Sequence, residues 1–236
     1  MKTGDSIKMQ KGNWGFGGDV PKKFVSHAEK SIPFYHEGHN LVCEISDFFC
    51  RQSSLCYEIG ASTGQLSKKL SDYNAHKKNI KWVCLEIEKS MIDVAKKHCL
   101  NKNNINFIEV DATTFDFEKC DFISSYYAIQ FIHPKHRQEL INKIYSSLNW
   151  GGGFIWFEKV RAPDARFQDM STTIYNDFKI GNGYNAEEIL NKTSSLKGVM
   201  EPFSTNGNIE LLKRAGFVDI TTVFKYVCFE GFLAIK

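Results

Sequence analysis

Two glycines follow an acidic residue in the stretch YEIGASTGQLS, residues 57–67, and this turn is the first place where the sequence suggests chemistry. A dinucleotide fingerprint needs a middle glycine that lets the backbone approach a pyrophosphate, and Ser62 stands there instead. A P-loop needs a lysine and a hydroxyl residue after its last glycine, and neither follows Gly64. Because both phosphate patterns fail, we expect Gly60 and Gly64 to shape a turn for a ligand with little negative charge.

Three acids accompany this turn. Glu58 ends the apolar run before it, Glu86 ends WVCLEI, and Asp111 ends IEVDA. One acid at the end of a strand is most often a solvated turn residue. Three of them meet at the carboxyl edge of one parallel sheet, where open α/β folds bind ligands. Glu86 could accept both ribose hydroxyls and Asp111 could reach an adenine amino group, so the constellation indicates an adenosine ligand.

Short apolar runs alternating with amphipathic segments must position these residues. Such alternation predicts a parallel sheet covered by helices on both faces. Helices are expected over 64–73, 89–100, 136–149 and 208–217, and the tail 218–236 is expected to form an antiparallel β-pair. The expected strands cover residues 55–60, 81–87, 105–112, 120–131 and 152–160.

Two helical regions flank this pattern. Residues 1–52 are expected to form an N-terminal helical lid, and residues 53–236 the main domain, with a helical insert at about 165–203. Within the insert, Asn185 followed by Glu188 predicts a capping box. The insert could close over a ligand or form a dimer interface.

Composition excludes several classes of protein. The net charge of +3 is spread over separate lysines, which argues against nucleic-acid binding. Cys56, Cys84 and Cys228 lie in apolar runs, and the odd total of 7 cysteines suits buried thiols in a reducing compartment. The sequence has no apolar run long enough for a membrane span and no signal-peptide pattern. We therefore expect a cytoplasmic protein without a membrane partner.

The motifs YEIGASTG, LEIEKSM, VDATTF, LNWGGGFIWFEK and RAGF together resemble class I S-adenosylmethionine-dependent methyltransferases. SIPFYH, DFKIGNGYNAEEI and KTSSLKGVM are similar to one branch, the carboxy-S-adenosylmethionine synthases of the tRNA wobble-uridine pathway. The resemblance implies a Rossmann-like, seven-stranded, mostly parallel sheet, S-adenosylmethionine as cofactor, and a homodimer. The predicted cofactor-binding residues are Tyr35, Glu58, Gly60, Ala61, Ser62, Gly64, Glu86, Ile87, Asp111, Ala112 and Tyr126.

Two positions depart from that branch. Its members carry an arginine that binds the extra carboxylate of the cofactor, and the matching residue here is Thr193. Threonine cannot form a charge-assisted bidentate pair, and Lys192 or Lys197 would have to reach in from other positions. Tyr126 also replaces an asparagine of the family. The departures favour ordinary methyl transfer over synthesis of the carboxylated cofactor.

Aromatic residues dominate the predicted acceptor side, so we expect a small apolar or aromatic acceptor. A base would help if the acceptor is a hydroxyl, and the predicted catalytic residues are His36, Glu158 and Tyr127, with His133 as a further option. The pair His36 and His39 is a weak metal pattern, and no metal is expected. The predicted substrate pocket consists of Trp14, Phe16, Trp156, Phe178, Tyr184 and Thr193.

Three functions therefore remain open. The preferred one is methyl transfer to a small molecule by direct displacement, with the nucleophile held in line behind the methyl group. The second is carboxy-S-adenosyl-L-methionine synthesis from prephenate. The third is a non-catalytic subunit that binds the cofactor and needs a partner protein.

Overall fold

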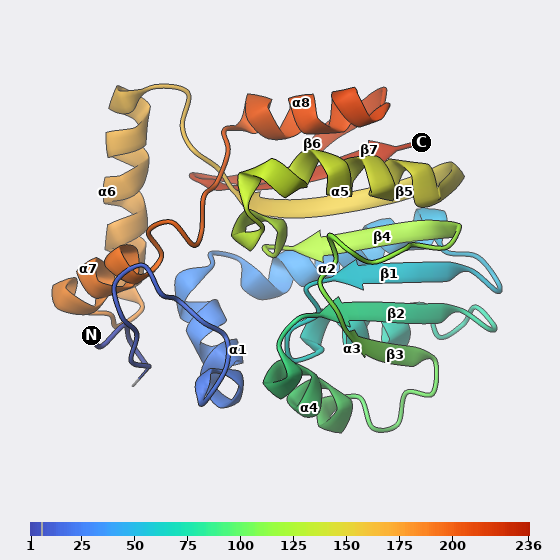
Figure 1. Ribbon diagram of the computed structural model, residues 1–236, viewed down its shortest axis with the longest axis horizontal. Coiled ribbons are helices and arrows are strands. Elements are labelled where there is room, and N and C mark those ends of the chain that lie inside the picture. Colours follow the sequence, from blue (N-terminus) through green and yellow to red (C-terminus); the bar gives the residue numbers. More distant parts are fainter. Residues whose placement is uncertain (6) are drawn as a thin grey trace.

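Seven strands form one sheet in the order β3-β2-β1-β4-β5-β7-β6 in the computed structural model, which describes residues 1–5 and 7–236 (Figure 1). Neighbours among the first five strands run parallel, whereas β7 runs antiparallel to both β5 and β6. The predicted α/β fold with a Rossmann-like, mostly parallel sheet is confirmed. The strands are β1 (Leu55–Ile59), β2 (Lys81–Glu86), β3 (Ile105–Glu109), β4 (Cys120–Tyr126), β5 (Leu148–Lys159), β6 (Asp219–Tyr226) and β7 (Phe229–Ile235).

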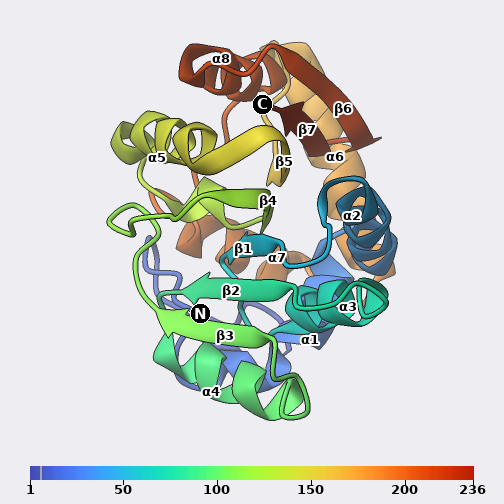
Figure 2. The same cartoon turned by 90° about the vertical axis from the view of Figure 1, so that its right-hand side faces the viewer.

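Helices cover both faces of the sheet (Figure 2). One face packs against α2 (Tyr35–Phe49), α3 (Gln65–Tyr73) and α4 (Lys89–His98), whose apolar residues share one core with the strands. The opposite face packs against α5 (Pro134–Ser147) and α8 (Thr205–Ala215), which share a second core. The crossovers between parallel strands require this three-layer arrangement.

Burial on both faces explains why the strands are continuous apolar runs. Cys56 and Tyr57 are neighbours in β1, yet each is buried in the core of a different face. Side chains alternate across a strand, so a central parallel strand needs apolar residues at every position. The short runs of the sequence are therefore central strands.

The N-terminal segment crosses the carboxyl end of the sheet and lies along α7 (Ala186–Ser195), beside α1 (Val20–Ser31) (Figure 1). The backbone N–H groups of Gly12 and Trp14 donate to the carbonyls of Ser194 and Ser195, at 3.0 and 3.1 Å. Between β5 and α7 stands α6 (Ala165–Gly181). The predicted capping box of Asn185 and Glu188 is present at the start of α7. The division into two domains stays a prediction.

Strand four ends earlier than predicted. Tyr127 adopts φ 57°, a left-handed conformation that a strand cannot continue, and a short 3₁₀ helix, η1 (Ile129–Phe131), follows. Strand five begins earlier than predicted, at Leu148, which pairs with Cys120 of β4. The register then shifts, and the regular ladder resumes at Gly153. The predicted antiparallel pair at the C-terminus is confirmed as β6 and β7.

All 7 cysteines are buried free thiols, which confirms the prediction for Cys56, Cys84 and Cys228. Within residues 1–5 and 7–236, no helix has the length and apolarity that a membrane crossing requires.

Candidate active site

A cavity of about 820 Å³ lies at the carboxyl ends of the parallel strands. The arrowheads of β1, β2 and β4 in Figure 1 point toward it, and α1, α7 and the N-terminal segment enclose it from the other side. Its wall therefore comes from three parts of the chain that are far apart in sequence. Trp14 and Phe16 of the N-terminal segment, and Thr193 of α7, are on this wall.

The turn after β1 forms the floor of the cavity. Gly60 has φ +75°, and a Cβ atom there would lie 2.3 Å from the Cβ of Ala128. The backbone N–H groups of Gly60 and Ala61 both donate to the carbonyl of Leu85, at 2.9 and 3.0 Å. Only glycine permits this conformation and this close approach, which fixes the turn against β2 and β4.

Gly64 has a different role from the one predicted. It also has a positive φ, but it is not on the cavity wall. A Cβ atom there would crowd Ala95, Cys99 and Phe107, at 3.1 to 3.2 Å. Gly64 therefore lets α3 begin close to α4 and β3, and it does not contact the space for the cofactor.

Glu86 and Asp111 lie on the wall at the ends of their strands. One Glu86 oxygen accepts from the N–H of Ser62 at 2.8 Å, and the other from Ile87 and Glu88 at 2.9 and 3.0 Å. Burial raises the pKa of Glu86, whereas these backbone donors lower it. A carboxylate has about four acceptor positions and three are in use, so Glu86 keeps capacity for one further donor, such as a ribose hydroxyl.

Asp111 uses one carboxylate oxygen within its own loop. That oxygen accepts from the backbone N–H and the hydroxyl of Thr113, both at 2.8 Å. The second oxygen has no hydrogen bond from a described residue. Asp111 and the neighbouring Ala112 both line the cavity, where the adenine of an adenosine ligand is expected.

Glu58 is buried beneath the turn and also touches the cavity. Its Oε2 accepts from the hydroxyl of Ser67 at 2.5 Å and from the thiol of Cys84 at 3.8 Å. Burial raises the pKa of Glu58 to about 8. Through Ser67 and Cys84, Glu58 links β1 to α3 and β2.

Several cavity residues carry buried polar atoms that find no hydrogen-bond partner among the described residues. They are the Trp14 Nε1, His39 Nδ1, Thr63 Oγ1 and Tyr127 Oη atoms. Buried polar atoms are usually satisfied in folded proteins. Four of the nine unsatisfied ones among the described residues line this cavity, where a polar ligand can pair with them. Together with the acids and the Gly60 turn, they fit a polar nucleoside cofactor.

Tyr126 closes the cavity against α2. Its hydroxyl donates to the carbonyl of Tyr35 at 3.0 Å, and its ring packs against the Tyr35 and His39 rings with centroids 5.8 and 4.5 Å apart. Gly38 makes room for this hydroxyl, because a Cβ there would lie 2.2 Å from it. Ile87 is on the cavity wall but its side chain is largely exposed.

The far side of the cavity is cationic. Lys159 of β5 and Lys179 of α6 lie over the ring of Tyr175, with their Nζ atoms 4.2 and 4.3 Å from its centroid. Lys192 of α7 completes the set, and all three residues line the cavity. None of them pairs with a carboxylate of residues 1–5 or 7–236.

Burial shifts the proton equilibria of these lysines. Desolvation lowers the pKa of Lys159, that of Lys179 to about 8 and that of Lys192 to about 7. The sequence does not predict Lys159 or Lys179 as site residues, because a lysine after a strand or on a helix is usually solvated. Their aromatic neighbour Tyr175 gave no signal that the sequence alone could reveal.

A family model described as "Methyltransferase domain" matches residues 57–152. The chain is 37% identical over 224 residues to the carboxy-S-adenosyl-L-methionine synthase of Staphylococcus epidermidis, covering 94% of this chain and 97% of that protein. It is 34% identical over 222 residues to the protein of the same name from Campylobacter lari, covering 94% of each. The chain belongs to the carboxy-S-adenosyl-L-methionine synthase family.

Solved structures share the fold. Human N-acetylserotonin methyltransferase in complex with S-adenosylmethionine superposes with a TM-score of 0.63 at 18% identity, over 92% of this chain and 56% of that one. The Haemonchus contortus phosphoethanolamine N-methyltransferase 2 gives 0.66 at 13% identity, over 94% of this chain and 58% of that one. Both solved chains are longer. The predictions of an enzyme and of S-adenosylmethionine as its cofactor are confirmed by the matched domain and the family.

Two predicted bases of this family member do not reach the cavity. His36 is exposed and bonds to Glu29 at 2.8 Å, and it is not a wall residue. Glu158 lies on the face of β5 away from the cavity, where its Oε1 accepts a hydrogen bond from the backbone N–H of Gln130 at 3.2 Å. The prediction of catalytic contact is wrong for both, since neither side chain faces the ligand space. Tyr127 and His133 do line the cavity.

Three predicted pocket residues also lie elsewhere. Trp156 is buried in the core beneath α5 and α8, because its neighbour Phe157 takes the other face of β5. Phe178 is beside Tyr175 but off the wall. Tyr184 lies behind the wall, where its hydroxyl is 3.1 Å from the Ser31 hydroxyl. In the part of the chain that the structure describes, no group of three or more metal-binding side chains occurs.

Proposed function

We propose that this chain is a carboxy-S-adenosyl-L-methionine synthase, which uses S-adenosylmethionine and an anionic carboxylate donor. The observation that carries the proposal is the cationic side of the cavity, with Lys159, Lys179 and Lys192 lacking carboxylate partners among the described residues. Burying a cation without a counter-ion is costly, so such a site favours an anionic ligand. The names of the relatives agree with this choice.

The acceptor side differs from the apolar pocket expected from the sequence. Trp14 and Phe16 do provide apolar wall, but the lysines stand opposite the cofactor floor. A neutral aromatic acceptor would leave their charges unpaired, whereas a dicarboxylate such as prephenate would compensate them. This charge balance supports the synthase over methyl transfer.

Ordinary methyl transfer is the second candidate. Thr193 supports it, because its hydroxyl donates a hydrogen bond to the carbonyl of Ile189 at 2.9 Å. The side chain also has no charge with which to bind a carboxylate. This candidate predicts a methylated acceptor and S-adenosylhomocysteine as products.

The chain's own residues would bind and orient the two substrates. Glu86 would accept a hydrogen bond from a ribose hydroxyl, and Asp111 one from the adenine amino group. The sulfonium makes its methyl group acidic, so the carboxyl group lost from the ring of prephenate would replace one methyl proton. That proton and the ring hydroxyl of prephenate would leave as water, and phenylpyruvate would remain. The N-terminal segment and α7 would exclude water from the cavity, and Tyr127 offers a buried hydroxyl that lacks a partner among the described residues.

Incubation of the purified protein with S-adenosylmethionine, with and without prephenate, tests the proposal. Mass spectrometry of the nucleoside fraction should show a product heavier than S-adenosylmethionine by one carbon dioxide, and only when prephenate is present. Formation of S-adenosylhomocysteine with a methylated small molecule would instead support the second candidate.

We also propose a homodimer working in the cytoplasm. Support for the dimer comes from α6, which stands at one end of the sheet and exposes Phe167, Met170, Ile174 and Ile180 (Figure 1). Light scattering on the purified protein should give twice the mass of one chain, and a monomer would contradict it. The 7 free thiols suit a reducing compartment.

A further inference from the structure

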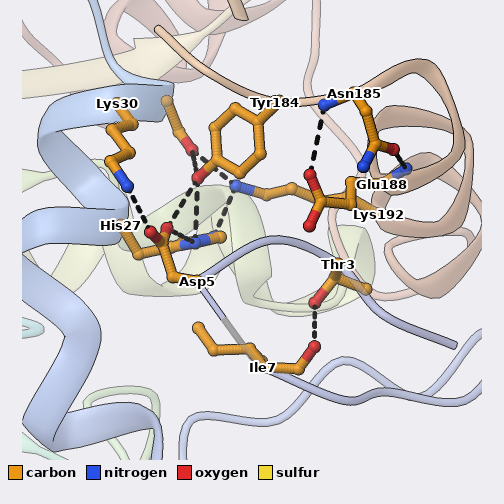
Figure 3. Close-up of polar contacts among 10 residues, drawn as sticks. Thr3, Asp5, Ile7, His27, Lys30, Tyr184, Asn185, Glu188 and Lys192 are labelled. Carbon is orange, nitrogen blue, oxygen red and sulfur yellow. Dashed lines mark hydrogen bonds and ion pairs between the residues drawn. The ribbon is translucent and has the colours of Figure 1, made fainter.

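Contacts with four side chains fix the position of Lys192 at the cavity wall. Its Nζ is 2.7 Å from the Nε2 of His27 and 2.7 Å from the hydroxyl of Ser31, both on α1 (Figure 3). Its cationic head also lies over the rings of Trp14 and Tyr184, at 5.4 and 5.8 Å. These contacts fix a long, flexible side chain in one geometry at the cavity wall.

Asp5 and Tyr184 orient the ring of His27. Its Nδ1 is 3.0 Å from the carboxylate of Asp5, in the N-terminal segment, and 3.0 Å from the hydroxyl of Tyr184 (Figure 3). Burial lowers the pKa of His27 to about 3, so the ring is neutral. With Nδ1 donating to Asp5, the Nε2 atom has a free lone pair and accepts from Lys192.

The partners of Lys192 leave its charge uncompensated at the wall. His27 and Ser31 accept hydrogen bonds but carry no charge, and the single nearby carboxylate of this network, Asp5, is engaged by Lys30 and Tyr184. Burial and the charges of Lys179 and Lys159 lower the pKa of Lys192 to about 7, while Asp5 raises it. An anion in the cavity would therefore favour the protonated form of Lys192.

We propose that Lys192, positioned by the Asp5–His27 pair and Ser31, is the residue that binds the carboxylate being transferred. This inference rests on the proposed function and assigns to Lys192 the task that Thr193 cannot perform. Lys197 also lines the cavity, but it lacks the set of hydrogen bonds that fixes Lys192.

Binding of the carboxylate by Lys192 depends on pH. Only protonated Lys192 attracts the carboxylate, and its pKa in the empty protein is about 7. The preference for a carboxylated ligand is therefore strongest below neutral pH and falls as the pH rises through 7 and above. Loss of a proton from Lys179, whose pKa is about 8, adds to this fall at higher pH.

Calorimetry with two probes tests the inference. Carboxy-S-adenosyl-L-methionine and S-adenosylmethionine differ only in the extra carboxylate. The ratio of their affinities therefore measures the contribution of that carboxylate, separate from the rest of cofactor binding. Lys192→Met should lower this ratio by about 10- to 100-fold, the usual value of a charge-assisted hydrogen bond, and should leave the affinity for S-adenosylmethionine within about 3-fold.

Further variants separate positioning from folding. Adding Thr193→Arg to Lys192→Met should restore the preference, because a guanidinium then stands on the same wall. Asp5→Asn should move the loss of preference to lower pH, since the Asp5 charge supports the proton on Lys192. Lys213→Met, on α8 and off the cavity wall, serves as the matched control and should leave the ratio unchanged.

Two failures can be told apart. If Lys192→Met keeps the wild-type ratio, the inference about Lys192 is overturned while the proposed function stands. If the wild-type protein itself shows no preference for the carboxylated probe, and no carboxylated product forms with prephenate, the proposed function fails first.

Discussion

The carboxylate of Glu86 has two tasks at the scale of a single residue. It accepts from Ser62, Ile87 and Glu88, and so joins the turn after β1 to the end of β2. It also lies on the cavity wall, where the ribose of the cofactor is expected. A half-buried carboxylate makes charge-assisted hydrogen bonds that a neutral amide cannot match.

Glu86→Gln should weaken S-adenosylmethionine binding by about 10- to 100-fold, because the amide offers one acceptor oxygen where the carboxylate offers two. Calorimetry measures the effect. Glu109→Gln, at the residue paired with Glu86 in the sheet and off the cavity wall, is the matched control. Equal affinities for the two variants would remove Glu86 from the cofactor site.

A pH effect on stability belongs to Glu158. Burial raises its pKa to about 8, whereas an unfolded glutamate has a pKa of about 4.3. The folded state therefore holds a proton that the unfolded state releases. This stabilisation is full below pH ~4.3 and is lost as the pH rises toward 8, on the order of 1 kcal/mol per pH unit.

Urea unfolding at a series of pH values between 5 and 8 checks this sign. Glu158→Gln should flatten the decline in the free energy of unfolding across that range. Glu210→Gln, an exposed carboxylate paired with Lys213 on α8, should keep the wild-type decline. If Glu158→Gln and the wild type follow the same curve, the buried proton is not there.

Single residues show where sequence reasoning succeeds. Glu86 and Asp111 could be predicted because a parallel sheet must bring strand ends to one edge. Glu158 and Trp156 could not be placed, because one residue of strand register decides which face each takes. From the sequence, Lys192 is only one possible substitute for the missing arginine, since its partner His27 is 165 residues away in sequence.

At the scale of helices and strands, the packing of α2 against β4 shapes one side of the cavity. The close approach of α2 to β4 depends on Gly38, above which the hydroxyl of Tyr126 reaches the carbonyl of Tyr35. A glycine inside a helix costs stability, so its presence at this contact reflects packing. The alternation of strands and helices was predictable from the sequence, but this contact and the left-handed turn at Tyr127 were not.

Gly38→Ala should destabilise the protein by about 2 kcal/mol, because a methyl group would displace the Tyr126 hydroxyl from a packed position. The free energy of unfolding in urea is the measurement. Gly181→Ala, at the end of α6 with nothing within 4 Å of an added Cβ, is the helical control and should be neutral or slightly stabilising. Equal stability for the two variants would show that the α2–β4 contact is loose.

The whole molecule assembles its site from distant segments. The cofactor floor comes from the sheet, one wall from the N-terminal segment and α1, and the cationic wall from β5, α6 and α7. Sequence patterns identified the floor because its motifs are local. The cationic wall depends on how the two helical regions lie over the sheet edge, which no local pattern encodes, and this is why an apolar acceptor was expected.

Transfer of a labelled carboxyl group tests the central claim most directly. Prephenate that carries a heavy carbon isotope in its ring carboxylate would be incubated with the protein and S-adenosylmethionine, and the nucleoside product analysed by mass spectrometry. Our account predicts a carboxylated product that contains the heavy carbon, in less amount for Lys192→Met than for the wild type. A nucleoside fraction with only S-adenosylmethionine and S-adenosylhomocysteine, and no labelled carboxyl group, would contradict it.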